Sequence, residues 1–229
     1  MWAIIRFPGS NCDRDCLDVC RRVLGVPAEL VDYRTGDLKR FELVILPGGF
    51  SYGDYVRAGA LARIAPAVRA LVQFAGEGRP VLGICNGFQI LLEAGLLPGA
   101  MLVNDHLEFR CQWVHLKCEN RRTPFTRDCP SVLAMPIAHK EGRYFLPPDE
   151  LARLEDGGQV VFRYCDASGR PLPESNPNGS VNNIAGICNA AGNVLGLMPH
   201  PERASEAALG GTDGRTLFES ALAHLAPSR

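Results

Sequence analysis

The stretch that decides the fold is an apolar run ending in a glycine-flanked cysteine, Val81-Leu82-Gly83-Ile84-Cys85-Asn86-Gly87-Phe88-Gln89. Residues 80–84 predict a buried strand, and residues 86–94 predict a helix that begins directly after it. Glycine two residues before and two residues after Cys85 allows a tight turn between them, in the cysteine form of the Gly-x-Ser-x-Gly nucleophile elbow. The stretch therefore predicts an α/β fold that presents Cys85 as a nucleophile. A buried structural cysteine in a glycine-rich turn is the alternative.

Apolar runs and helical patterns alternate through the rest of the first half of the chain. We expect strands at residues 2–7, 29–33 and 43–46, and helices at residues 10–24, capped by Ser10 or Asn11, and at residues 60–75, interrupted or begun near Pro66. Strands that are apolar along their whole length are typical of a parallel sheet covered by helices on both faces. This half therefore predicts an open, mostly parallel α/β sheet flanked by helices.

The second half is richer in strands. Strands are expected at residues 102–103, 112–118, 132–138 and 159–164, with little helix between them. A hairpin is expected from strands at residues 184–188 and 194–198, followed by a last helix at residues 214–225. The pattern predicts an extra β-rich segment within one domain that spans residues 1–229.

Composition excludes several classes of protein. The 229 residues are 46% hydrophobic and 21% charged, with a formal net charge of −1, which gives no reason to expect nucleic acid or a membrane surface as a partner. No apolar run approaches the roughly 18–20 residues of a membrane span, and the N-terminus lacks the pattern of a signal peptide. We therefore expect a cytoplasmic protein.

The nine cysteines do not indicate a metal or a disulfide framework. Close Cys-x-x-Cys pairs, which zinc sites favour, do not occur, and the chain is longer than typical disulfide-stapled domains. Cys12, Cys16 and Cys20 are spaced four apart, so they share one helix face, where cysteine packs as a small apolar residue. We expect no bound metal.

A nucleophilic cysteine needs a base, and the base needs a group that orients it. His200 follows the apolar strand at residues 194–198, within Met198-Pro199-His200-Pro201-Glu202. Active sites of open α/β sheets form at such carboxyl ends of strands. Residues two apart in an extended chain point the same way, so Glu202 is expected to hold the His200 ring. A surface loop is the alternative.

Thioester chemistry also needs N–H donors for the oxyanion of its intermediate. Gly48-Gly49 ends the strand at residues 43–46, at the same edge of the sheet as Cys85 and His200. The Gly49 N–H and the Asn86 N–H are the expected donors. A glycine pair after a strand means little alone, but elbow, glycine pair and His-x-Glu together predict a catalytic triad.

The three segments Gly48-Gly49, Gly83-x-Cys85-x-Gly87-x-Gln89 and His200-Pro201-Glu202 resemble the signatures of class I, triad-type glutamine amidotransferases, which are flavodoxin-like α/β proteins. Five longer segments are similar to the glutaminase subunits of phosphoribosylformylglycinamidine synthases, in their small-subunit form: residues 7–15, 47–60, 137–144, 176–180 and 196–203. One departure is Lys140, where that family has a glycine, so the shape of the loop around it is open.

The resemblance implies roles for individual residues. Cys85 attacks the side-chain amide of glutamine, His200 protonates the departing ammonia and then activates water, and Glu202 holds His200. Gly49 and Asn86 form the oxyanion hole, while Gly48 and Gln89 border the substrate, with Gln89 near its amino-acid end. Local capping of the helix is the alternative for Gln89.

The resemblance also implies partners. The transfer of ammonia to the purine precursor needs ATP, yet the chain lacks the Gly-x-x-x-x-Gly-Lys-Ser/Thr loop. ATP and magnesium are therefore expected on a large synthetase subunit, beside a small accessory subunit, with no cofactor in this chain. Ammonia is expected to pass to the synthetase by an enclosed path. Loops 10–15 and 51–57 are candidate docking segments, or ordinary solvated loops.

Two other functions remain open at this point. One is a different hydrolase with a cysteine elbow on the same fold, which would arrange its histidine differently from His200-x-Glu202. The other is a regulatory subunit without activity, against which the intact Cys85, His200 and Glu202 argue. His106, His115 and His139 receive no role from the sequence.

Overall fold

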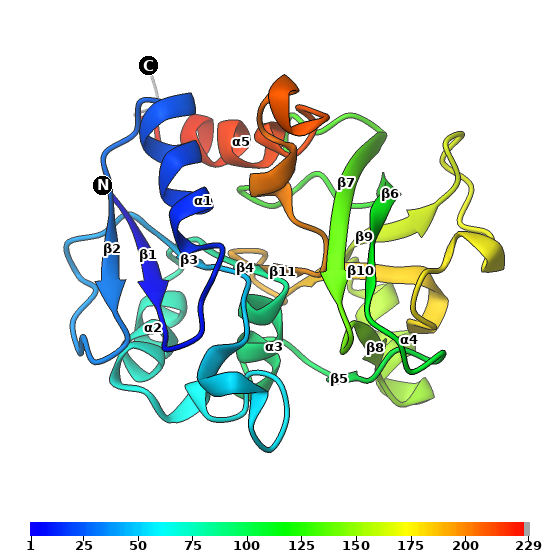
Figure 1. The fold of residues 1–229 in the computed structure, drawn as a ribbon, viewed down its shortest axis with the longest axis horizontal. Helices are drawn as coiled ribbons and strands as arrows, with labels where there is room; N and C mark the ends of the chain where they lie inside the picture. The colour runs from blue at the N-terminus through cyan, green and yellow to red at the C-terminus, as the bar shows by residue number, and fades with distance from the viewer. Residues whose placement is uncertain (227–229) are drawn as a thin grey trace.

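A nine-stranded mixed sheet forms the centre of the computed structural model, which describes residues 1–226 (Figure 1). The strand order is β2-β1-β3-β4-β11-β10-β9-β6-β7. The first five of these strands run parallel: β2 (Ala28–Asp32), β1 (Trp2–Arg6), β3 (Leu43–Leu46), β4 (Val81–Ile84) and β11 (Val194–Leu197). Their carboxyl ends therefore meet at one edge, where the predicted reacting residues follow β3, β4 and β11.

The rest of the sheet is antiparallel. It consists of β10 (Ile184–Cys188), β9 (Val160–Cys165), β6 (Arg110–Cys118) and β7 (Val132–His139). A separate two-stranded sheet pairs β5 (Ala100–Leu102) with β8 (Arg143–Phe145). The β-rich second half is thus confirmed, and it extends the parallel sheet.

Helices cover both faces of the parallel strands. In Figure 1, α1 (Asp13–Asp18) and α5 (Arg215–Leu225) lie on one side of β3, β4 and β11, and α2 (Pro66–Gly76) and α3 (Asn86–Glu93) lie on the other. A π-helical turn continues α1 over Val19–Val23, and α4 (Pro148–Asp156) lies between β8 and β9. Short 3-10 turns occupy Ser51–Asp54, Ala62–Ile64, Pro173–Ser175, Val181–Asn183, Pro201–Ala204 and Ala207–Leu209.

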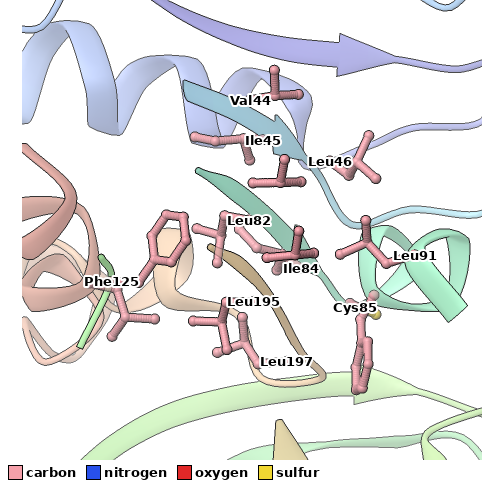
Figure 2. Close-up of a cluster of buried hydrophobic side chains, with 14 of the residues drawn as sticks. Val44, Ile45, Leu46, Leu82, Ile84, Cys85, Leu91, Phe125, Leu195 and Leu197 are labelled. Carbon is pink, nitrogen blue, oxygen red and sulfur yellow. The ribbon is translucent and has the colours of Figure 1, made fainter. Parts of the chain in front are cut away.

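The adjacent strands β3, β4 and β11 form part of the buried core. Every residue of these three strands is buried, as expected for strands covered on both faces. Figure 2 shows Leu82 and Ile84 of β4 between the side chains of the neighbouring strands, with Cys85 at the end of the row. Each buried aliphatic side chain contributes about 1.5–3 kcal/mol, so this core fixes the strand end that carries Cys85.

Several local predictions differ from the structure. The first helix begins after Cys12 without a side-chain cap, because the Ser10 hydroxyl instead accepts a hydrogen bond from the Phe7 N–H at 3.0 Å. The helix expected at residues 60–75, interrupted or begun near Pro66, does begin at Pro66, whose fixed φ suits a first helical turn. The expectation of little helix in the second half is wrong at α4, which also begins at a proline and carries Asp149 and Glu150 in its first turn.

Within residues 1–226, none of the helices combines the length and the apolar character needed to span a membrane.

Candidate active site

Cys85 lies at the turn between β4 and α3 in a strained conformation. Its φ of 50° and ψ of −105° are rare for a residue with a side chain, and its N–H is held by the Leu197 carbonyl at 2.8 Å. Such strain persists only where the surroundings impose it, and it clusters at functional sites. The elbow predicted from the sequence is thus present in the geometry of the backbone.

The two glycines beside Cys85 are required by packing. A Cβ on Gly83 would lie 2.5 Å from Leu91 Cδ1 of α3, and a Cβ on Gly87 would lie 2.0 Å from the Leu46 carbonyl oxygen of β3. Because helix and strand approach this closely on either side, only glycine fits at both positions. The turn is therefore held in place by the two elements that it joins.

The His200 ring is buried against the Glu202 carboxylate. Nδ1 of His200 lies 2.6 Å from Glu202 Oε1, and both residues are 1% exposed. The main-chain N–H of His200 donates a hydrogen bond to the Pro136 carbonyl of β7 at 2.8 Å. Glu202 belongs to the 3-10 turn Pro201–Ala204 instead of an extended segment, yet the predicted contact forms.

Electrostatics favour the charged form of this ring. Burial opposes the charge, but the Glu202 carboxylate and the Cys85 sulfur outweigh it and raise the pKa of His200 well above its usual value. Within residues 1–226, His200 Nε2 is buried without a hydrogen-bond partner. Glu202 fixes Nδ1, so Nε2 is the atom left for proton transfer.

Gly48 lies beside the His200 ring, and Gly49 lies against the backbone of residues 9–11. A Cβ on Gly48 would lie 2.7 Å from His200 Cε1, and Gly49 has a φ of 149° and would clash with Ser10 and Asn11. Among the described residues, no acceptor takes the Gly49 N–H. The Asn86 N–H is at the first position of α3, where backbone donors have no partner within the helix.

Gln89 is buried one turn into α3, and both ends of its amide are engaged. Its Nε2 donates to the Glu141 carbonyl at 2.6 Å, and its Oε1 accepts from Asn86 Nδ2 at 2.9 Å. Asn86 Oδ1 accepts from the Ser51 N–H at 3.2 Å. Gln89 therefore ties the loop after β7 to α3, a contact that local capping of the helix would not require.

The chain is similar to known proteins over nearly its whole length. Residues 1–211 match the family described as CobB/CobQ-like glutamine amidotransferase domain. The chain is 57% identical over 223 residues to phosphoribosylformylglycinamidine synthase subunit PurQ of Thermomicrobium roseum, covering 96% of this chain and 94% of that protein. This chain is a member of the glutamine amidotransferase family.

Other members support the same placement. The PurQ subunit of Aquifex aeolicus is 53% identical over 223 residues, covering 96% of this chain and 98% of that protein. The solved structure of PurLQS from Thermotoga maritima contains a chain that is 43% identical, with a TM-score of 0.87 and 98% of each chain covered. The glutaminase domain of Trypanosoma brucei CTPS, 12% identical with a TM-score of 0.60, shares the fold. The predicted family and fold class are thus confirmed.

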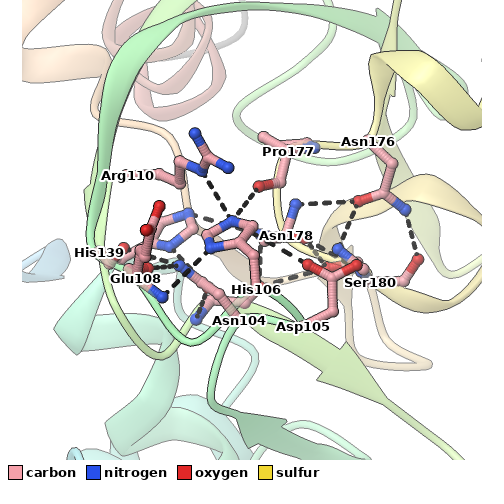
Figure 3. A network of polar contacts seen from close by, with 12 residues as sticks. Asn104, Asp105, His106, Glu108, Arg110, His139, Asn176, Pro177, Asn178 and Ser180 are labelled. Atoms are coloured by element: carbon pink, nitrogen blue, oxygen red, sulfur yellow. Dashed lines mark hydrogen bonds and ion pairs between the residues drawn. The ribbon is translucent and has the colours of Figure 1, made fainter.

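His139, which the sequence left without a role, lies in a buried polar network beside this amidotransferase site (Figure 3). Its Nδ1 lies 3.2 Å from Asn104 Oδ1, and its Nε2 lies 3.5 Å from Asn178 Nδ2. Burial and then the charge of His200 lower the pKa of His139 to about 3. His139 is therefore a neutral wall of the site, with the backbone of Gly142 packed on its ring.

The other two unassigned histidines lie farther out. His106 contacts the Pro177 carbonyl at 3.0 Å and Arg110 Nε at 2.8 Å (Figure 3). His115 is exposed on β6. Lys140 is also exposed and has no positive φ, so a lysine fits at the position where the resemblance led us to expect a glycine.

Loop 51–57, a predicted docking candidate, has an unusual backbone. Tyr52, Asp54 and Val56 all have positive φ, and Tyr55 and Val56 are 75% and 80% exposed. Burial and then Glu141 raise the pKa of the Asp54 carboxyl to about 6. Aspartate tolerates a positive φ, but tyrosine and valine do not favour it, so the sequence carries no signal for the strain at Tyr52 and Val56.

One neighbour of the site overturns a prediction. Cys12 was expected only to pack on its helix face, but its Sγ lies 3.9 Å from His200 Nδ1 and 3.0 Å from Arg203 Nη2. Ligand-type atoms of Cys12, His200 and Glu202 lie within 4.8 Å of one another. The Arg203 cation beside the sulfur and the hydrogen bond between His200 and Glu202 make the cluster unfavourable for a second cation, so we assign no metal to it.

Proposed function

We propose that this chain is the glutaminase subunit of a phosphoribosylformylglycinamidine synthase and that it acts through Cys85, His200 and Glu202. The observation that carries the proposal is the strained Cys85 elbow next to a buried His200–Glu202 pair. The high sequence identity to PurQ subunits supports glutamine hydrolysis for this synthase over the reaction of another cysteine-elbow hydrolase.

The proposed reaction begins with attack by the Cys85 thiolate on the carboxamide carbon of glutamine. The resulting oxyanion accepts hydrogen bonds from the Gly49 and Asn86 N–H groups, whose removal in comparable sites costs about 10²–10³ in kcat. His200 then gives its Nε2 proton to the departing nitrogen, so that ammonia leaves and a thioester forms on Cys85.

Hydrolysis of the thioester completes the cycle. His200, now neutral, takes a proton from water, and the hydroxide attacks the thioester carbon. Collapse of the second intermediate releases glutamate and returns the thiolate and the imidazolium. Glu202 stabilises that imidazolium and fixes its tautomer, the role of the carboxylate in a triad.

Gly48 and Gln89 are proposed to shape the substrate pocket. Gly48 leaves room beside the His200 ring that any side chain would fill. Both polar ends of Gln89 are already engaged, so its proposed part is to hold residues 139–142 as the wall near the amino-acid end of glutamine.

The proposed partners follow from the relatives. The PurQ proteins are named as subunits, and the Thermotoga maritima structure is of PurLQS. We propose that a large synthetase subunit, with a small accessory subunit, binds ATP and magnesium and receives ammonia from this chain. The cytoplasmic location and the single-domain organisation stay predictions.

The test is the Cys85→Ala variant in the complex with its synthetase. Synthesis fed by glutamine should fall by at least about 10³-fold, while synthesis fed by free ammonia should stay near the wild-type rate. Cys20→Ala, at a buried cysteine of the helix after β1, is the matched control and should retain both activities. Glutamine-fed synthesis at a normal rate in Cys85→Ala would overturn the proposal.

A further inference from the structure

Cys12 lies beside the His200–Glu202 pair, with its Sγ 3.9 Å from His200 Nδ1. It directly precedes α1, is fully buried, and its N–H donates to the Gly48 carbonyl at 3.2 Å. A Cβ on Gly48 would lie 3.2 Å from Cys12 Sγ and 2.7 Å from His200 Cε1. The sulfur is therefore packed against the same glycine as the imidazole.

The hydrogen bonds of the thiol are fully used. Its S–H donates to Asn11 Oδ1 at 3.2 Å, and its sulfur accepts from Arg203 Nη2 at 3.0 Å. His200 Nδ1, at 3.9 Å, is already bound to Glu202 at 2.6 Å, so the sulfur is not its hydrogen-bond partner. The main polar task of Cys12 is to hold the Arg203 guanidinium.

That guanidinium lies close to a carboxylate that could bind it. Arg203 Nε forms a long ion pair with Glu202 Oε1 at 3.9 Å, too far for a hydrogen bond, and Glu202 Oε2 is buried without a hydrogen-bond partner among the described residues. Charged hydrogen bonds between guanidinium and carboxylate are strong and often bidentate. Without the sulfur, a small movement would let Arg203 hydrogen-bond directly to Glu202 and compete with His200.

We propose that Cys12 is a positioning residue of the amidotransferase site: by binding Arg203 it keeps the guanidinium from moving closer than its present ion-pair distance into direct hydrogen bonds with Glu202, so that the hydrogen bond to Glu202 comes from His200. This inference rests on the proposed function of the His200–Glu202 pair. It assigns a task to a cysteine that spacing alone had placed on an ordinary packed helix face.

The charged groups around His200 determine how the pH dependence of kcat should change when Cys12 is replaced. Burial opposes the charge of the ring, and Glu202 and Cys85 outweigh it and raise the pKa of His200. Its other titratable or charged neighbours are Cys12 and His139, with Arg203 and Asp15 acting through Glu202. If Arg203 neutralises Glu202, the pKa of His200 falls and the imidazolium is lost at a lower pH. Because the imidazolium protonates the departing ammonia, the high-pH limb of kcat should then move to lower pH.

The experiment measures glutamine hydrolysis by the complex with its synthetase. Cys12→Ala should lower kcat by about tenfold or more, with KM changed by less than about threefold, and should move the high-pH limb of kcat downward. Cys12→Ser, which keeps a donor and an acceptor, should stay within about threefold of the wild type. Cys12→Val, close to cysteine in volume, replaces Cys12→Ala if the smaller side chain prevents folding.

The decisive comparison is the double variant Cys12→Ala/Arg203→Gln. Removing the competing cation should restore kcat at least about fivefold over Cys12→Ala and return the pH profile, a coupling that only interacting residues show. Cys20→Ala controls for the loss of a buried thiol. A double variant as slow as Cys12→Ala, or an unmoved pH profile, would overturn the inference, whereas failure of the Cys85→Ala test would overturn the proposed function itself.

Discussion

The parallel and antiparallel halves of the sheet contribute different parts of the site. The ends of β3, β4 and β11 carry Gly49, Cys85 and His200, which are the groups proposed to react or to bind the oxyanion. The antiparallel strand β7 contributes two backbone carbonyls and the neutral His139 ring. The Pro136 carbonyl accepts from the main-chain N–H of His200, and the Ala138 carbonyl lies 3.8 Å from Cys85 Sγ. One half supplies chemistry, and the other supplies a wall that positions it.

The two halves also differ in how well they tolerate a side chain in place of glycine. On the parallel side the neighbours of the elbow glycines are mainly backbone and core atoms, which cannot move. On the antiparallel side the neighbour of Gly142 is the His139 side chain. Substitutions in the parallel half should therefore cost more than similar substitutions in the antiparallel half.

The largest effect is expected at Glu202. Glu202→Gln keeps the shape of the side chain but loses the charge that stabilises the His200 imidazolium. We expect kcat for glutamine to fall by about 10³-fold and thermal stability to fall as well, because the buried His200 ring loses its charged partner. Steady-state kinetics of the complex measures this, with ammonia-fed synthesis as the internal control. A loss of kcat below tenfold would show that the His200–Glu202 pair contributes less to catalysis than the side of the site formed by the antiparallel half.

Gly87→Ala should have the next largest effect, on stability. Its Cβ would lie 2.0 Å from the Leu46 carbonyl oxygen, so strand and helix must separate, at a cost of about 3 kcal/mol or more in the free energy of unfolding. Gly142→Ala, 2.2 Å from His139 Cε1, should cost less because a side chain, and not the main chain, must give way, at the cost of its contacts to Asn104 and Asn178. Urea unfolding compares the two.

A matched control for that experiment is Gly76→Ala, at the end of α2. No atom lies within 4 Å of its added Cβ, so the change should stay within about 1 kcal/mol. Equal losses for Gly87→Ala and Gly142→Ala would contradict the difference between the two halves.

The wall should also respond to pH through His139. The pKa of this ring is about 3 in the folded protein, below its unfolded value near 6.5, so the unfolded chain binds a proton that the folded chain excludes. Its contribution to stability is present above about pH 6.5 and is lost as the pH falls toward 3, by up to about 1.4 kcal/mol per pH unit. Urea unfolding between pH 7 and pH 5 should show a smaller loss in His139→Asn than in the wild type. Parallel losses would contradict the buried neutral ring.

The smallest effect is expected at Lys140→Gly. Lys140 is exposed and has an ordinary φ, so glycine relieves no strain there. We expect a change of less than about 1 kcal/mol in stability and less than about twofold in kcat, which unfolding and kinetics can measure. A large gain in either quantity would show that lysine distorts the loop.

The sequence predicted the parallel half well for a physical reason. Wholly apolar strands, a glycine-flanked cysteine and a histidine after a strand are local patterns, and the rule that sites form at the carboxyl ends of parallel strands brings them together. Cys85, His200 and Glu202 could be placed in this way, and the structure brings the three into one buried site.

The residues that surround the reacting groups could not be predicted in the same way. His139 meets Asn104 and Asn178 across the fold, and Cys12 meets Arg203 from the opposite end of the chain. Such contacts depend on the packing of segments far apart in sequence, which periodicity does not encode. The positive φ values of Tyr52 and Val56 are likewise not encoded by residue type.

The central claim is that Cys85 alone among nine cysteines is the nucleophile. The most direct measurement is mass spectrometry of the complex after reaction with a diazoketone analogue of glutamine. We predict one label per chain, on Cys85, and protection by excess glutamine. Label on Cys12 or spread over several cysteines, or label on Cys85 that glutamine does not prevent, would contradict the account.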